Sequence, residues 1–537
     1  MLKLTTLTAA TLLASAPIMA ATPNYADIQT VVVIYAENRS FDNLYGTFPG
    51  ANGLTKANRT SIVQLDRDGK PMRGLPPIWG GIAGRTMAGA PVAPVPITQG
   101  QTATYLGAFN HPYDVAGLYR TGATADTDPL HYTNRDLFHR FYENQMQING
   151  GANNMFAAWA DSGGLTMGYF TPKPKDLPLW NWARQYVLAD NFFQGAFGGS
   201  FLNHFYLICS CAPLYGHDGI NPNGGANPSV SAVEADGVTL TPAANSPASA
   251  LDGPPVFKHS GNLTPDFYAI NTMMPPYAPS GNADATQQTV DLKSGSTLVP
   301  QTESTIGDLL TGAKVDWAYY AGAWDFALSH PPLAAGSTKA NPNFQYHHQP
   351  FNYFAAFDPT TAEGKANRTA HLLDAGVVTD PDALPESRFL SDIRGAKLPP
   401  VTFYKPQGSV NQHAGYANVT DGDRHIAAVL TALKASPQWQ HMLVVVTYDE
   451  FGGWWDHAAP PKADRFGPGT RVPALIVSPF ARKGTVDHTL YDTTSILRFI
   501  TNKWKLPVLP GIAERDRALS AHHQPKLGDL TGGLVLR

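Results

Sequence analysis

The sequence predicts an α/β fold: a mostly parallel central sheet with helices on both faces, and long loop-rich insertions that form a cap. Two continuous apolar runs, at 30–35 and 443–448, predict buried strands, because β-branched runs of this length are typical of parallel sheets covered on both faces. Helical and strand-like patterns alternate in the carboxyl-terminal half, which favours parallel strands joined by helices. With 43% hydrophobic and 15% charged residues, the 537-residue chain has a globular composition.

The remaining elements follow from periodicity. The patterns predict a helix over 133–158, a helix over 179–186 and a short strand over 187–193. In the carboxyl-terminal half they predict, in order, a helix over 304–313, strands over 315–320 and 400–404, a helix capped by Asp421, a strand over 472–477 and a helix over 492–504.

A segment at about 221–301 is rich in Gly, Ala, Pro, Ser and Asn and has little apolar pattern. This composition is typical of an insertion built of loops rather than of a second compact domain. We therefore expect one domain over residues 21–537, with this insertion as part of its cap.

Residues 1–20 have one early Lys, an apolar stretch and small residues at the end, which predicts a secretory signal peptide. We expect a periplasmic or secreted protein without a transmembrane anchor. Cys209 and Cys211 then either close a small disulfide, which we favour, or stay as buried thiols; a metal or redox role is less expected. The net charge of −4 does not indicate the positive electrostatic potential that nucleic-acid binding requires.

Both apolar runs end in acidic clusters. Glu37 and Asn38 follow the first run, and Asp449 and Glu450 follow the second. The carboxyl ends of parallel strands meet at one edge of a sheet, so we expect these side chains to lie together. Crowded carboxylates repel one another unless a cation is bound, which predicts a metal site with oxygen ligands. These donors suit Ca²⁺, Mg²⁺, Mn²⁺ or iron and do not identify the ion.

Ser200 follows two glycines, Gly198 and Gly199, after the predicted short strand. Such a turn presents a hydroxyl to a ligand, although an ordinary glycine turn with a capping serine has the same pattern. An α/β-hydrolase elbow needs glycine two residues after the serine, where this chain has Leu202. Activation of the hydroxyl by a bound cation fits better.

Four histidines lie in loops rich in Gly and Pro. Each alone is typical of a structural or surface residue, but together they could hold phosphate oxygens and protonate a leaving group, because their pKa lies near neutrality. These are His111, His347, His348 and His413.

Three motifs in this order carry a family resemblance: Tyr-Ala-Glu-Asn-Arg-Ser-Phe-Asp-Asn at 35–43, Phe-Gly-Gly-Ser-Phe-Leu-Asn-His at 197–204 and Tyr-Asp-Glu-Phe-Gly-Gly-Trp-Trp-Asp-His at 448–457. Short matches at 471–473, 478–479 and 491–492 extend it. The chain resembles the bacterial phosphoesterase family, which unites acid phosphatases and phospholipases C on an alkaline phosphatase-like sheet.

The resemblance implies roles for particular residues. It implies a phosphoseryl intermediate at Ser200, with the four histidines around the phosphate and His413 as the acid. Asn203 and His204 are expected to orient phosphate or ligands, although Asn203 could equally tie down the turn. Asp456 and His457 either act directly or hold the strand end in place. The implied metal ligands are Glu37, Asn38, Ser200, Asp449 and Glu450.

The expected activity is hydrolysis of small phosphate monoesters, because the residues after Ser200 are more like those of the acid phosphatases and the sequence stops about thirty residues after Trp504. A phospholipase C acting on phospholipids is the alternative. A cation- or phosphate-binding protein without turnover is a third hypothesis. A sulfatase is less expected, because its Pro and Arg are absent after Ser200. Oligomeric state stays open.

Overall fold

A computed structural model gives the fold over residues 24–82, 97–120, 129–171, 177–216, 229–284, 286, 289–330 and 342–536. The predicted signal peptide lies outside these described residues. The strands are β1 (Thr30–Ala36), β2 (Tyr113–Asp114), β3 (Gly168–Tyr169), β4 (Val187–Ala189), β5 (Phe192–Phe193), β6 (Trp317–Ala321), β7 (Leu372–Asp374), β8 (Val401–Lys405), β9 (Met442–Tyr448), β10 (Ala474–Val477), β11 (Thr485–Asp487) and β12 (Tyr491–Asp492).

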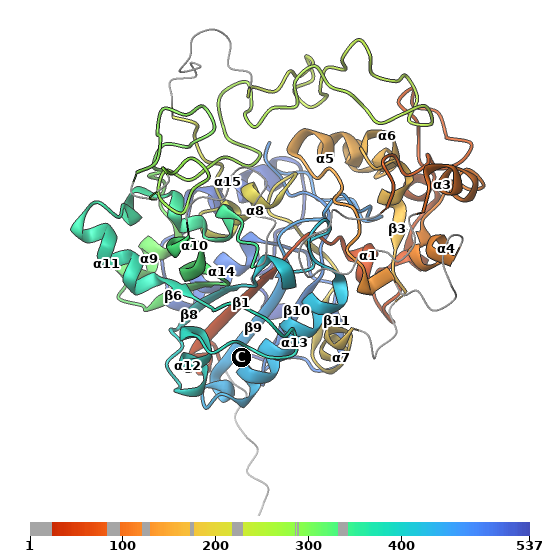
Figure 1. Cartoon of the computed structure of the whole chain (residues 1–537). Coiled ribbons are helices and arrows are strands. Elements are labelled where there is room, and N and C mark those ends of the chain that lie inside the picture. Colours follow the sequence, from red (N-terminus) through yellow and green to blue (C-terminus); the bar gives the residue numbers. More distant parts are fainter. Residues whose placement is uncertain are drawn as a thin grey trace, which may run out of the picture.

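Eight strands form the central sheet, in the order β11-β4-β10-β9-β1-β8-β6-β7 (Figure 1). All neighbours in it are parallel except where β10 meets β9 and β4. Strands β1 and β9 lie side by side at its centre and are buried along their whole length, as their continuous apolar sequences require. The predicted mostly parallel sheet is confirmed.

Helices cover the sheet on both sides. Helix α13 contacts α7 and α12, whereas α14 contacts α8, and Figure 1 shows the strands between α13 in front and α14 behind. The helices are α1 (Phe41–Tyr45), α2 (Arg59–Ile62), α3 (Gln99–Leu106), α4 (Val115–Arg120), α5 (Phe141–Ile148), α6 (Phe156–Trp159), α7 (Pro178–Gln185), α8 (Ser200–Ile208), α9 (Ile306–Gly312), α10 (Trp324–Ser329), α11 (Ala362–His371), α12 (Arg388–Arg394), α13 (Val419–Ala435), α14 (Thr494–Trp504) and α15 (Pro510–Ala521). Within the described ranges, no helix has both the length and the apolar character to cross a membrane.

Three local predictions were wrong. The expected helix over 133–158 starts only at Phe141 and is interrupted after Ile148, where Asn149 is left-handed and two glycines follow. The expected strand over 187–193 is divided between β4, in the central sheet, and β5, which pairs with β12. Helix α13 is capped by Asn418, whose side chain accepts from the Asp421 N–H, so Asp421 lies inside the first turn.

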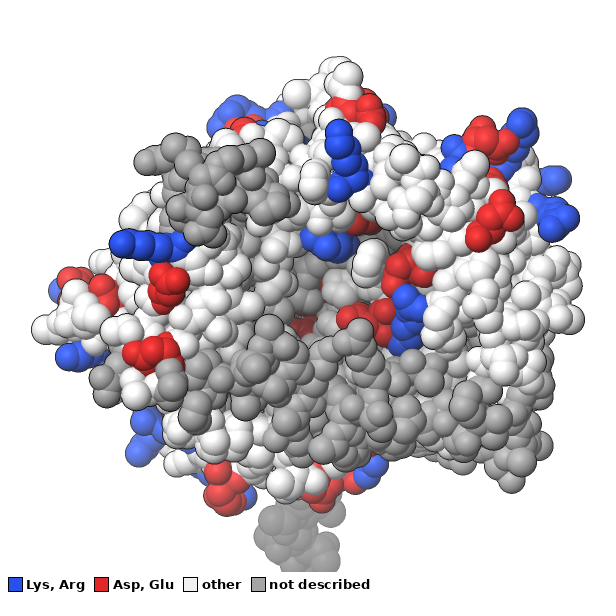
Figure 2. Space-filling model, turned by 45° about the horizontal axis from the view of Figure 1, so that its top comes forward, with Lys and Arg blue, Asp and Glu red and all other residues white. Residues whose placement is uncertain are grey.

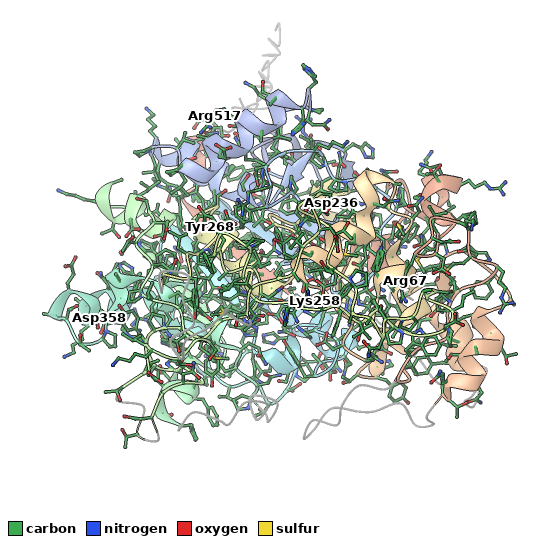
Figure 3. All side chains as sticks on the ribbon, turned by 90° about the horizontal axis from the view of Figure 1, so that it is seen from above. Arg67, Asp236, Lys258, Tyr268, Asp358 and Arg517 are labelled. Carbon is green, nitrogen blue, oxygen red and sulfur yellow. A yellow bond between two sulfur atoms is a disulfide. The ribbon has the colours of Figure 1, made fainter. Side chains whose placement is uncertain are left out.

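The described part of the 221–301 insertion contains isolated β-bridges and no helix. Seen from above, its loops carry Asp236, Lys258 and Tyr268 across the middle of the molecule (Figure 3). Arg465 binds Asp266 through two contacts of 2.7 Å and fastens these loops to the core. Nearby, Cys209 and Cys211 form the expected disulfide at the end of α8.

Arg515 on α15 is fully buried between two carboxylates, Asp464 and Asp492, each 2.5 Å away. We expect Arg515→Met to lower the free energy of unfolding by about 3–5 kcal/mol, because it leaves both carboxylates buried without their partner. Chemical denaturation measures this. The matched control is Arg517→Met on the same helix, whose side chain is exposed (Figure 3) and whose loss should cost less than about 1 kcal/mol. Equal losses in the two variants would contradict the expectation.

Candidate active site and metal centre

The two acidic strand ends meet at one edge of the sheet. In the parallel pairing of β1 with β9, Ala36 lies opposite Tyr448, so Asn38 and Asp449 leave the sheet together. The Asn38 N–H donates to Asp449 Oδ1 over 3.1 Å. Asn38 has a left-handed backbone, with φ of 62°, which turns the chain sharply after the strand. The expected convergence is therefore present.

Ser200 is the first residue of helix α8 and reaches this edge. Its Oγ lies 3.3 Å from Asn38 Oδ1 and 3.2 Å from Glu450 Oε1. Gly198, with φ of 83°, makes the turn, and a Cβ there would lie 2.5 Å from the Phe141 nitrogen. The free N–H groups at the start of α8 also favour a negatively charged ligand beside Ser200.

Asn203 holds the turn that presents Ser200. Its Oδ1 accepts from the Ala196 N–H over 2.9 Å, and its Nδ2 donates to the carbonyls of Ala196 and Gly199, each over 3.1 Å. The side chain is fully buried and both ends are engaged. These contacts favour the structural interpretation of Asn203 over direct contact with phosphate.

The oxygens around Ser200 fit a cation. Oxygen ligands at adjacent corners of an octahedral ion lie about 3 Å apart for bonds of about 2.1 Å, close to the separations of Ser200 Oγ from Asn38 and Glu450. Within the described residues, Asp449 Oδ2 is buried without a hydrogen-bond partner. Burial and the charge of Glu37 raise the pKa of Asp449 to about 7, and burial raises that of Glu450 strongly. A bound cation would stabilise the ionised form of both carboxylates.

Glu37 has a different environment. Its Oε1 lies 2.5 Å from His348 Nε2 and 2.7 Å from Lys405 Nζ, while its Oε2 accepts from Asn411 and Tyr416, each over 2.8 Å. Although burial opposes it, the contact with His348 and the charge of Lys405 hold the pKa of Glu37 well below its usual range. Glu37 thus lies beside the oxygens around Ser200 and is already bound by protein donors.

The histidines divide into two groups. His347 and His348 are buried near His204, and burial lowers the pKa of each, so they are neutral at physiological pH. His204 Nδ1 contacts the Ser200 carbonyl at 2.7 Å and lies 3.8 Å from Asp449. His111 is elsewhere: it is exposed beside α3, where it stacks on Phe109. The structure does not bring His111 to Ser200.

His139 was missed from the sequence. Its Nε2 lies 3.6 Å from Glu450 Oε1 and 3.3 Å from Asn38 Nδ2. Although burial would lower it, the carboxylates of Glu450 and Asp136 raise the pKa of His139 to about 9. Its ring lies 5.6 Å from that of His413. Only tertiary structure brings His139 here, since nothing in its local sequence marks it.

Asp456 and His457 belong to a second buried cluster. Arg471 binds Asp456 Oδ1 at 3.0 Å and Asp42 Oδ1 at 3.1 Å, and His457 Nδ1 lies 2.6 Å from Asp42 Oδ2. Asp42 follows β1 and Asp456 follows β9. The cluster therefore ties together the two loops that carry the acidic strand ends, which agrees with the interpretation that Asp456 and His457 hold the strand end in place.

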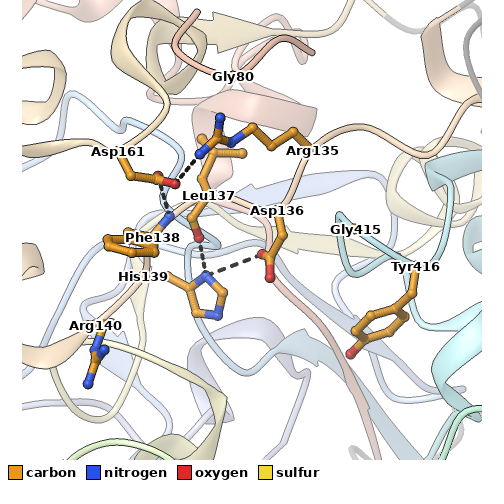
Figure 4. Close-up of a pocket in the computed structure, with 10 residues that line it drawn as sticks. All are labelled: Gly80, Arg135, Asp136, Leu137, Phe138, His139, Arg140, Asp161, Gly415 and Tyr416. Atoms are coloured by element: carbon orange, nitrogen blue, oxygen red, sulfur yellow. Dashed lines mark hydrogen bonds and ion pairs between the residues drawn. The ribbon is translucent and has the colours of Figure 1, made fainter. Parts of the chain in front are cut away.

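Two adjoining cavities open over Ser200. One, of about 360 Å³, is lined by Ser200, His347 and His413; the other, of about 550 Å³, is lined by Arg135 and Asp161. Their shared residues are Asp136, His139, Arg140 and Tyr416. Figure 4 shows Asp136 and His139 between the Arg135–Asp161 pair and Tyr416, and Figure 2 shows one face hollowed near its middle, beside acidic and basic side chains.

The family model described as "Phosphoesterase family" matches residues 28–507. The chain belongs to this family. The match includes both acidic strand ends, Ser200 and the histidines around it, so the whole candidate site lies inside it.

Curated relatives of this chain include phospholipases C. Non-specific phospholipase C6 of Arabidopsis thaliana is 34% identical over 124 residues, 18% of this chain and 23% of the relative. Phospholipase C B of Mycobacterium tuberculosis is 29% identical over 153 residues, 24% and 29% of the two chains. Non-hemolytic phospholipase C of Pseudomonas aeruginosa is 27% identical over 172 residues, 26% and 24%. The chain thus spans about a quarter of the length of these relatives.

Likeness to solved structures is weak. The lipoteichoic acid synthase LtaP of Listeria monocytogenes has a TM-score of 0.28 at 9% identity, covering 62% of this chain and 67% of that one. A 2-O GAG sulfatase has a TM-score of 0.29 at 10% identity, covering 64% and 68%.

A metal-binding measurement tests the centre. We expect Ca²⁺, Mg²⁺ or Mn²⁺, added singly to chelator-treated protein, to raise its unfolding temperature, because an ion at 100 times its Kd stabilises the fold by about 2.7 kcal/mol. Asp449→Asn should lose most of this rise. Without metal the variant should be at least as stable as the wild type, because it removes one of three buried carboxylates.

Differential scanning calorimetry measures both effects. Glu363→Gln, at an exposed position on α11, is the control and should keep the full rise. A rise in Asp449→Asn as large as in the wild type would place the ion elsewhere.

Proposed function

We propose that this chain is a metal-dependent acid phosphatase that hydrolyses phosphate monoesters through a phosphoseryl intermediate at Ser200. The observation that carries the proposal is the position of Ser200 Oγ, on a glycine turn at the start of α8 and within 3.3 Å of Asn38 and Glu450. Membership of the phosphoesterase family supports it. A nucleophile, carboxylates that fit a cation and protonated imidazole meet there, as phosphoryl transfer requires.

Asn38, Ser200, Asp449 and Glu450 would hold the metal, with Glu37 beside them. When bound, the ion supplies positive charge that lowers the pKa of the serine hydroxyl and offsets charge on the transferred group. Ser200 Oγ attacks phosphorus, and its proton passes to Glu450, the carboxylate that already accepts its hydrogen bond. The ester P–O bond breaks as the Oγ–P bond forms. Water then attacks phosphorus and gives a proton to His139, and the P–Oγ bond breaks as Glu450 returns its proton to Oγ.

The departing alcohol oxygen needs a proton. His413 lines the cavity, but burial lowers its pKa, so it is mostly neutral at physiological pH. His139 is the better acid, because the carboxylates of Glu450 and Asp136 raise its pKa and favour the protonated ring. His413, stacked on Tyr416 with ring centroids 4.1 Å apart, then orients the phosphate.

Phospholipase C activity is the second candidate, favoured by the printed names of the relatives. The same serine and metal would serve a phosphodiester, so the groups around the cavity decide between the two. A cation- or phosphate-binding protein without turnover is the alternative from another class, and it would bind these ligands and release no product.

We also propose that the protein is exported to the periplasm or the medium. Residues 1–20 have the pattern of a signal peptide, and the Cys209–Cys211 disulfide suits an oxidising compartment. Sequencing the amino terminus of protein recovered from outside the cytoplasm tests this; an intact residue 1 there would contradict it.

Ser200→Ala tests the nucleophile. We expect kcat for 4-nitrophenyl phosphate to fall at least about a thousandfold, because the variant lacks the Oγ that attacks phosphorus. Ser329→Ala, an exposed serine at the end of α10, is the matched control. Undiminished turnover in Ser200→Ala would overturn the mechanism. A wild-type preference for 4-nitrophenylphosphocholine over the monoester would favour phospholipase C.

The role of His139 as the proton donor predicts a pH dependence of kcat. We expect kcat to fall at alkaline pH, because His139, whose pKa the carboxylates of Glu450 and Asp136 raise, then loses the proton that the leaving oxygen takes. His139→Gln should have a much lower kcat without this alkaline limb. His111→Gln, at an exposed position away from Ser200, should keep the wild-type pH profile. An alkaline limb that persists in His139→Gln would assign it to another group.

A further inference from the structure

One wall of the cavity over Ser200 comes from the 221–301 insertion. Asn262, Asn271 and Thr272 line it, opposite Ser200 and Gln345 of the rest of the chain. These three wall residues and Gln345 present three amides and one hydroxyl, all polar and uncharged. The group esterified to a phosphate at Ser200 would face this surface.

The wall is fixed to the core beside His139. Arg140 Nη2 donates to the Gly261 carbonyl over 3.1 Å and to Asn262 Oδ1 over 3.0 Å. Asn271 Nδ2 donates to the same carbonyl over 2.7 Å, and its Oδ1 accepts from the Phe141 N–H over 3.3 Å. The polar groups are therefore held in place before any substrate arrives, which favours specific recognition.

The two arginines near this wall already bind protein groups. Arg140 binds the wall itself, and Arg135 binds Asp161 at 2.5 Å in the adjoining cavity. Asp136 lies between the two cavities with its side chain 51% exposed. A second phosphate would meet this carboxylate without a free guanidinium, whereas a hydroxyl could donate to it.

Aromatic rings that could hold a quaternary ammonium are covered in this cavity. Tyr416 stacks on His413 and donates its hydroxyl to Glu37. Phe201 is 2% exposed and packs on Tyr353. Recognition of such cations needs open aromatic faces.

We propose that this cavity selects phosphate monoesters of an uncharged, hydroxyl-rich group, such as a sugar or polyol, with Asp136 and Thr272 as specificity residues. The proposal rests on the proposed phosphatase function and names its substrate class. Hydroxyls of the substrate donate to the Asp136 carboxylate and exchange hydrogen bonds with the Thr272 hydroxyl and the Gln345 amide, while the phosphate lies at Ser200.

A matched pair of substrates tests it on the full, metal-loaded protein. Glucose 6-phosphate and cyclohexylmethyl phosphate are both monoesters of a primary alcohol on a six-membered ring and differ chiefly in the ring hydroxyls. We expect kcat/KM for the sugar phosphate to be at least about tenfold higher, because sites built to bind hydroxyls reject analogues without them. Phosphocholine and fructose 1,6-bisphosphate should both be poorer than glucose 6-phosphate.

Two isosteric variants locate the preference. Asp136→Asn and Thr272→Val should each lower the ratio of kcat/KM between the two ring substrates severalfold, because each removes a hydrogen-bonding group and keeps the shape. Thr302→Val, at an exposed threonine that lines neither cavity, should keep the wild-type ratio.

Turnover of 4-nitrophenyl phosphate separates the two proposals. If it is hydrolysed but the two ring substrates are equal, or phosphocholine is best, the substrate class is wrong and the phosphatase function stands. An unchanged ratio in both wall variants would also overturn the assignment. If no phosphate ester is turned over under several metals and pH values, both proposals fail.

Discussion

The structure depends on the parallel pairing of β1 with β9, which brings two acidic strand ends to one place. Because Ala36 lies opposite Tyr448, Glu37, Asp449 and Glu450 leave the sheet together, and all three are fully buried. Buried like charges are costly unless compensated. The surrounding structure supplies the compensation in two ways. Lys405 neutralises Glu37, which His348 also contacts, and the other two carboxylates, beside Ser200, keep the room and the unpaired oxygen that a cation needs.

Positioning in this site relies on buried polar contacts rather than on the sheet alone. Arg471 joins the loops after β1 and β9 through Asp42 and Asp456. Arg515 donates to the Gly195 carbonyl, and Asn203 binds Ala196, so the turn before Ser200 is held from two sides. Loops rich in glycine can then place a nucleophile as firmly as strands do, because each flexible segment is tied at several points.

The sequence alone was sufficient to predict the fold class and the acidic side chains that follow the two central strands. Continuous β-branched runs revealed β1 and β9, and their common edge followed from parallel strand geometry. The same argument applied to the strand predicted over 400–404 would have found Lys405, the last residue of β8. His139 could not be found this way, because it follows no predicted strand and reaches the site only through tertiary packing. The helix expected over 133–158 failed because the chain before Phe141 is not helical and left-handed Asn149 interrupts the pattern. In the sequence, His111 could not be distinguished from the other loop histidines. Only the structure shows that it lies away from Ser200.

The left-handed backbone of Asn38 limits what evolution can place there. Its main-chain N–H faces Asp449, while its side-chain oxygen faces Ser200, and both depend on a positive φ. Glycine adopts this conformation easily but has no oxygen to offer, and aspartate would add a fourth buried negative charge. Larger or β-branched residues would strain the turn. This position thus requires both a positive φ and an uncharged side-chain oxygen, and asparagine meets both requirements.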